Sequence, residues 1–333
     1  MFLQLDLRSL VPRRSLTAAV LFLAVAGVVA GLAQRQVGRA VGGLEHARPI
    51  WLWAAASCFV AGLLASSSVW RSALALCGGR LSRTDAAARY GVGSLVNGLM
   101  PVRIGEAVRL TLFARRLEGD DRAWRMAGVF ALITAMRLVV FGIVIGSAAA
   151  VGAVPLRLML VVAGVGVLTA VVAFTARDRT PRTHVAHLLD AFRALGRSPR
   201  DGARIAGWVA VSTGARFAGA TAIAAALGVH GPVLAALIIL PTLDLAGLIP
   251  LSGNVGITSG AVTMALQAHG VGLEQALSTG LAFHAVETAA GIACGTAGVF
   301  LLGTRKRVFV LAAAGAAACV AAAFCATVLV PLA

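Results

Sequence analysis

The chain has 333 residues, of which 59% are apolar and 13% charged, and its mean hydropathy is +0.90. Soluble proteins carry about 25% charged residues, so this composition excludes an ordinary soluble protein. The net charge of +16 raises nucleic acid as a partner, but apolar runs divide the basic residues into separate clusters. Such a division indicates membrane topology, and we expect no nucleic-acid partner.

Apolar runs of about 20 residues, the length that spans a bilayer as a helix, recur along the chain. Two shorter apolar runs, 91–102 and 232–250, are interrupted or ended by proline and glycine and predict broken or re-entrant segments. We therefore expect an all-α polytopic membrane protein that forms a single integral membrane domain over residues 1–333. The predicted full spans are 16–34, 50–70, 126–152, 157–175, 205–227, 275–302 and 308–330.

Most of the basic residues lie in four segments, at about 8–14, 71–125, 177–204 and 305–307. The positive-inside rule places all four in the cytoplasm, so in the cytoplasmic membrane the N-terminus lies inside and the C-terminus outside. The first apolar run is longer than a usual signal-peptide core, which favours an uncleaved anchor. The run at 91–102 then enters from the cytoplasm and the stretch 232–269 from outside. Alternatively, 232–250 crosses fully and 257–269 returns.

The first break lies between Asn97 and Arg109. Pro101 lacks an N–H group and Gly98 and Gly105 loosen the backbone, so a helix ends here and restarts near Gly105. The restarted helix points its free N–H groups and the positive end of its dipole toward the break, where an anion can bind.

Charged residues surround this predicted helix start. Arg103 and Arg109 add positive charge for an anion, and Glu106 in the first turn can pair with either arginine. The alternative interpretation is a juxtamembrane helix with ordinary salt bridges.

The second break follows Asp244, where an apolar half-helix ends at Pro250 and a glycine-rich turn precedes a helix at 257–269. Ser252, Asn254 and the free backbone groups of the turn can coordinate a polar ligand. A simple extracellular turn is the alternative. The candidate residues of this turn are Pro250, Ser252, Gly253, Asn254 and Gly256.

The two breaks have similar sequences. Gly98-Leu99-Met100-Pro101-Val102 matches Gly247-Leu248-Ile249-Pro250-Leu251, and an odd number of predicted full spans separates them. The breaks should therefore face opposite sides of the membrane, which is the pattern of transporters built from inverted repeats. The repeat halves would be 10–153 and 157–302, followed by an extra helix at 308–330.

Four further ionisable residues lie inside predicted spans: Arg137, Arg216, His284 and Glu287. A charge at the bilayer centre costs roughly 2.5–3.5 kcal/mol, so these residues should face the bundle interior and pair. We expect Glu287 to pair with Arg137 or Arg216. The group either lines a polar path for a lipid headgroup or only fixes helix packing, and titration of His284 would allow proton coupling.

The run from Asn97 to Arg109, N-x-x-x-P-x-R-x-G-E-x-x-R, resembles the hallmark of the lysylphosphatidylglycerol synthase transmembrane family. The run from Ile249 through Gly256, followed by the span with His284, resembles its second signature, and the resemblance covers about residues 10–305. Three positions depart from the family pattern: Ser252-Gly253-Asn254 replaces proline-glycine-glycine, Ser259 replaces a glutamate, and His284 replaces an arginine. A headgroup other than the lysylated one is therefore expected.

The resemblance implies a flippase or transporter of a polar or anionic lipid, or of a lipid-linked precursor. An intramembrane transferase and a non-catalytic partner of a lipid-synthesis complex are the alternatives. No soluble catalytic domain fits in the longest linker, 176–204, and no metal or nucleophile motif occurs, which argues against an enzyme and predicts no cofactor.

Expected partners are a membrane phospholipid or polyprenyl-linked lipid, a lipid-synthesis enzyme, or a second copy of the chain. The candidate substrate-binding residues are Asn97, Pro101, Arg103, Gly105, Glu106, Arg109, Asp244, Pro250, Ser252, Gly253, Asn254 and Gly256.

Overall fold

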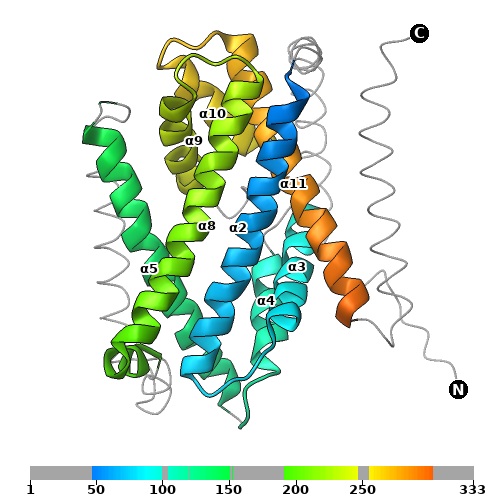
Figure 1. The fold of residues 1–333 in the computed structure, drawn as a ribbon, viewed down its shortest axis with the longest axis vertical. Coiled ribbons are helices and arrows are strands. Elements are labelled where there is room, and N and C mark those ends of the chain that lie inside the picture. The colour runs from blue at the N-terminus through cyan, green and yellow to red at the C-terminus, as the bar shows by residue number, and fades with distance from the viewer. Residues whose placement is uncertain are drawn as a thin grey trace, which may run out of the picture.

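The computed structural model describes residues 47–99, 104–119, 121–150, 152, 191–246 and 255–302. Within these ranges the chain is helical and contains no strand, which confirms the predicted all-α fold (Figure 1). The helices are α2 (Pro49–Leu76), α3 (Arg83–Leu99), α4 (Gly105–Ala114), α5 (Arg122–Ala150), α8 (Pro199–Ala226), α9 (Pro232–Ala246), α10 (Val255–Gln267) and α11 (Leu273–Leu302).

Four of these helices, α2, α5, α8 and α11, are long and apolar enough to cross a membrane. They correspond to the predicted spans at 50–70, 126–152, 205–227 and 275–302. Each has 28 to 30 residues, or about 42–45 Å of helix, so each extends beyond a hydrocarbon core of about 30 Å. The other predicted spans, 16–34, 157–175 and 308–330, lie outside the described residues.

Local sequence explains where two of the long helices begin and end. Pro49 and Pro199 occupy the first turn of α2 and α8, where a missing N–H group costs no hydrogen bond. Gly78 and Gly228 follow the ends of the same helices with φ of 84° and 68°, a left-handed conformation that glycine adopts without strain. These signals fix the lengths of the two helices that form the most extensive contact in the structure.

The shorter helices form two hairpins at opposite ends of the bundle. Figure 1 shows α3 and α4 in the lower half, where α2 ends and α5 and α8 begin, and α9 and α10 in the upper half. The helix predicted from 91 begins earlier, at Arg83, because its first two turns are polar and hydropathy does not detect them. Helix α9 covers the first 15 residues of the predicted run 232–250, and residues 247–254 lie outside the described residues.

Each hairpin has its own hydrophobic core. The core under α9 and α10 includes Phe59 of α2 and Phe283 of α11, whose rings meet edge to face at 5.1 Å. The core under α3 and α4 includes Trp70 of α2 and Phe113 of α4, whose ring centroids are 5.0 Å apart. Because α2 and α8 contribute residues to both cores, they connect the two ends of the molecule.

Helix α11 contacts both hairpins through glycine. A Cβ atom on Gly91 of α3 would lie 2.5 Å from the carbonyl oxygen of Cys294, and one on Gly280 would lie 2.8 Å from that of Ser259 in α10. Small residues let the helix backbones approach closely, as is typical of helix pairs in membranes. The position of each hairpin is therefore set against the same long helix.

Candidate functional site

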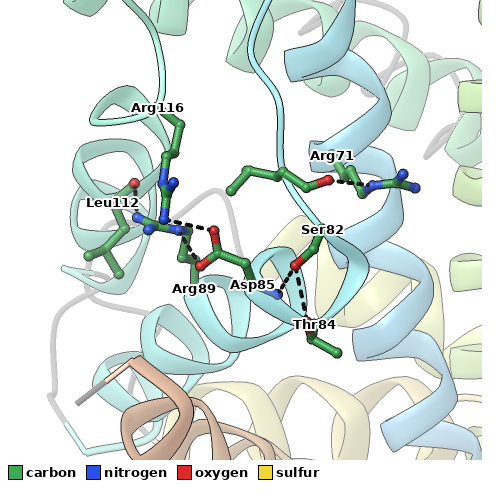
Figure 2. A network of polar contacts seen from close by, with 8 residues as sticks. Arg71, Ser82, Thr84, Asp85, Arg89, Leu112 and Arg116 are labelled. Carbon is green, nitrogen blue, oxygen red and sulfur yellow. Dashed lines mark hydrogen bonds and ion pairs between the residues drawn. The ribbon is translucent and has the colours of Figure 1, made fainter. Parts of the chain in front are cut away.

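An ionic network joins the start of α3 to the end of α4 (Figure 2). The carboxylate of Asp85 lies 3.1 Å from Arg89 and 3.0 Å from Arg116, and its backbone N–H donates to the Ser82 hydroxyl. Arg89 also donates to the carbonyl oxygen of Leu112 in α4, at 2.6 Å. The network closes the open end of the hairpin and so positions its other end, next to the break at 100–103.

At that other end the two helices of the hairpin cross with almost no space between them. The backbone N–H of Gly105 donates to Oδ1 of Asn97 at 2.7 Å, so Asn97 satisfies the first N–H group of α4. A side chain on Gly105 would overlap the carbonyl oxygen of Gly93 and the amide of Asn97. Helix α4 thus starts at the predicted residue, Gly105, and the N–H group of that residue is already hydrogen-bonded to Asn97.

Arg109 lies inside this hairpin and is only 3% exposed. Its guanidinium donates to Glu106 at 2.6 Å and to the Ser94 hydroxyl at 3.1 Å, and it stacks 3.9 Å from the ring centroid of Tyr90. Within the described part of the chain, Nε of Arg109 and Oε2 of Glu106 are buried without a hydrogen-bond partner. Such atoms are rare in folded proteins, and they are the groups here that a ligand can satisfy.

A second charged cluster lies well inside the long helices. Arg216 of α8 contacts Asp244 of α9 and Glu287 of α11, each at 3.1 Å. The predicted pairing of Glu287 with Arg216 is confirmed, and Asp244 joins it as a second acid. These three side chains are 32%, 40% and 36% exposed, so the cluster is accessible although the helices around it are apolar.

The remaining predicted path residues lie near one of the two clusters. His284 precedes Glu287 by about one helical turn, and its Nδ1 lies 3.5 Å from the Thr258 hydroxyl of α10, at the outer limit for a hydrogen bond. Arg137 of α5 has no ion pair with another described residue, and its charge acts on Tyr90. The alternative pairing of Glu287 with Arg137 is therefore not the one formed.

Uncharged polar groups lie between the two clusters. Tyr90, which stacks against Arg109, lies next to Ser66 of α2. The Ser66 hydroxyl lies 2.7 Å from that of Ser212 in α8. Ser212 precedes Arg216 by four residues and so lies on the same face of α8. Polar side chains thus lie between the first hairpin and the face of α8 that carries Arg216.

Several predicted residues lie outside the described residues, namely Pro101, Arg103, Pro250, Ser252, Gly253 and Asn254. Gly256 lies in the first turn of α10. Among the described residues, no group of three or more His, Cys, Asp or Glu side chains is arranged to hold a metal ion.

The sequence-based prediction did not include five residues of this site: Asp85, Arg89, Tyr90, Ser66 and Ser212. One signal could have found the first two. Asp85, Arg89, Gly93 and Asn97 recur every four residues, so they lie on one face of a helix, and this face contacts α4. Tyr90 and the two serines show no comparable spacing.

The arrangement can be compared with known proteins. No curated protein and no solved structure matches the chain. One family model, described as "Lysylphosphatidylglycerol synthase TM region", matches residues 15–295, a range that contains both hairpins and both charged clusters. Since this match covers most of the chain, the protein is a multi-pass membrane protein and belongs to the lysylphosphatidylglycerol synthase TM region family.

Proposed function

We propose that the protein moves a polar or anionic lipid, or a lipid-linked precursor, between the leaflets of the cytoplasmic membrane. Membership of the family suggests a function related to membrane lipids. The observation that carries the proposal is the partly exposed Arg216 cluster inside apolar helices, with polar side chains between it and the buried Arg109. Charges at membrane depth are costly, and where they occur they commonly mark a substrate pathway.

The charge distribution supports an orientation for this path. The basic segment 71–125 and the described part of the second one, 191–204, border the end of the bundle that carries α3 and α4, so we place that end in the cytoplasm. The hairpin α9–α10 then faces outward, with the N-terminus inside and the C-terminus outside. Hairpins entering from opposite sides are typical of inverted-repeat transporters, which supports the halves 10–153 and 157–302.

In this proposal the headgroup meets three sites in turn while the acyl chains stay in lipid. Arg103 and Arg109 bind its phosphate at the start of α4, and Glu106 orients Arg109. Arg216 binds the phosphate at the centre. The turn with Ser252 and Asn254 receives it on the outer side. A headgroup that enters the membrane loses its hydration, and this loss is the main free-energy cost of crossing lipid. Polar side chains along the path form hydrogen bonds in place of the lost water.

The test uses purified protein in vesicles that contain fluorescent phospholipids with different headgroups. A membrane-impermeant quencher reports the fraction of label in the outer leaflet over time. We expect accelerated movement for at least one headgroup, and a loss of about tenfold or more with Arg109→Ala. The matched control is Arg200→Ala, which removes an exposed arginine at the start of α8 and should leave the rate unchanged.

Other outcomes separate the alternative functions. A chemically altered lipid recovered from the vesicles would favour the intramembrane transferase. Folded protein that neither moves nor alters any lipid would contradict the transport proposal and favour the non-catalytic partner of a lipid-synthesis complex.

A further inference from the structure

The Arg216 cluster contains one more negative than positive charge when both acids are ionised. One guanidinium contacts two carboxylates, which come from two different helices, α9 and α11. The two ion pairs use different nitrogen atoms, NH1 toward Asp244 and Nε toward Glu287. The cluster therefore holds an uncompensated negative charge inside an apolar bundle.

The helices packed around Asp244 offer little to offset this charge. Helix α10 contains no titratable side chain, and neither do residues 247–254. The titratable side chain in the apolar middle of α5 is Arg137. It forms no ion pair with any described residue, and its positive charge lies near Tyr90. On α11 the facing titratable groups are Glu287 itself and His284, and Gly62 of α2, which has no side chain, lies next to Arg216.

An anionic headgroup makes the imbalance larger. Arg216 donates to Asp244 from NH1 and to Glu287 from Nε, and a phosphodiester that takes over either of these nitrogens displaces the carboxylate bound to it. The displaced acid and the phosphate would then place two excess negative charges among apolar helices, which is strongly unfavourable. If the displaced acid takes up a proton, the charge of the cluster stays constant.

We propose that Asp244 and Glu287 form a proton-binding site that takes up a proton when an anionic phosphate binds Arg216. The proton comes from water and binds the carboxylate oxygen released from the guanidinium, and the two acid side chains are 40% and 36% exposed. When the phosphate leaves, the ion pair re-forms and the proton returns to water. The proposal rests on the transport function above and adds its coupling ion.

Isothermal titration calorimetry of the purified protein tests this site directly. Glycerophosphoglycerol, a water-soluble anionic headgroup without acyl chains, is titrated into the protein in two buffers with different ionisation enthalpies. The difference between the observed binding enthalpies gives the number of protons taken up. We expect about one proton per headgroup for the wild-type protein, since one charge must be compensated.

Variants assign the proton to its site. Asp244→Asn and Glu287→Gln should each abolish proton uptake, because the cluster then starts neutral. Arg216 keeps one acidic partner in either variant, so both should fold. The matched control Glu274→Gln, in the first turn of α11, should take up the same proton as the wild type. Glycerophosphocholine, which carries its own positive charge, should bind without proton uptake.

Four results would overturn the proposal. Binding without proton uptake removes the proton site but leaves the transport function standing, and binding that requires Na⁺ without proton uptake replaces the proton by a metal cation. Uptake that persists in both carboxylate variants and disappears in His284→Gln moves the site to the imidazole. If neither headgroup binds the folded protein, this inference fails, and the vesicle assay decides the transport function separately.

Discussion

Arg109 and Arg216 differ in where their partners come from. Arg109 contacts Glu106, Ser94 and Tyr90, which all belong to its own hairpin, and only 4% of its side chain is exposed. The side chain of Arg216 is 32% exposed, and its partners lie 28 and 71 residues away in sequence, on two other helices. One site is thus local and buried, whereas the other is assembled by the fold and partly exposed.

This difference has consequences for what each site can do. A pair three residues apart on one helix keeps its geometry as long as the helix exists, so the Arg109 site is preorganised. A cluster whose three members lie on three helices changes whenever one helix shifts, and its exposure lets a ligand compete with the acids. The first site is suited to recognising a phosphate and the second to passing it on.

The largest expected effect comes from Arg216→Ala. This change leaves Asp244 and Glu287 without their shared cation, and we expect lipid movement to fall about tenfold or more in the vesicle assay. The free energy of unfolding should fall by about 2 kcal/mol, less than the 3–5 kcal/mol of a fully buried pair, because solvent screens a cluster that is one third exposed.

Thermal unfolding in detergent measures the stability, and Arg216→Lys, which keeps the charge, should recover most of it. A variant with wild-type transport would show that the cluster only fixes packing.

The next effect concerns the buried Arg109 site. Gly105→Ala places a methyl group where the backbone of Gly93 and the amide of Asn97 already lie, so the hairpin must separate. We expect a loss of about 1–3 kcal/mol in unfolding free energy, which is the usual range for overpacking. Gly146→Ala on α5 is the matched control, since no atom lies within 4 Å of its Cβ position, and it should not lower the melting temperature. Equal melting temperatures for the two variants would show that the hairpin is not rigid at this crossing.

A smaller effect is expected from Asn97→Ala. Its amide oxygen accepts the first N–H group of α4, and the loss of such a cap costs about 1 kcal/mol. In Asn97→Asp the carboxylate keeps the acceptor, so stability should recover in thermal unfolding. If both variants lose the same stability, the capping bond does not hold the start of α4.

The sequence predicted the break near Pro101 and the restart of α4 at Gly105 because proline and glycine act locally on the backbone. It also predicted the pair between Arg216 and Glu287, because a charge in an apolar span requires a partner. Both predictions follow from rules that need only the chain itself.

Other features depend on contacts that no local pattern contains. Hydropathy did not detect the polar start of α3, although the four-residue spacing of Asp85, Arg89 and Asn97 marks its face toward α4. Asp244 was predicted as part of the second break, but its pairing with Arg216 requires α9 to fold back along α8. The contact between Ser66 and Ser212 depends on the packing of two helices, and small polar residues are too common in helices for this pair to be predicted.

The smallest expected effect tests whether the two sites belong to one path. Ser212→Ala removes the hydrogen bond to Ser66, and we expect a loss of about 0.5–1 kcal/mol in unfolding free energy. Ser57→Ala removes an exposed hydroxyl that bonds only within α2 and should leave both stability and transport nearly unchanged. If Ser212→Ala slows lipid movement in the vesicle assay by more than its stability loss explains, the headgroup passes between α2 and α8. If its transport equals that of Ser57→Ala, the two arginine sites act independently, and the polar contacts between them only hold α2 against α8.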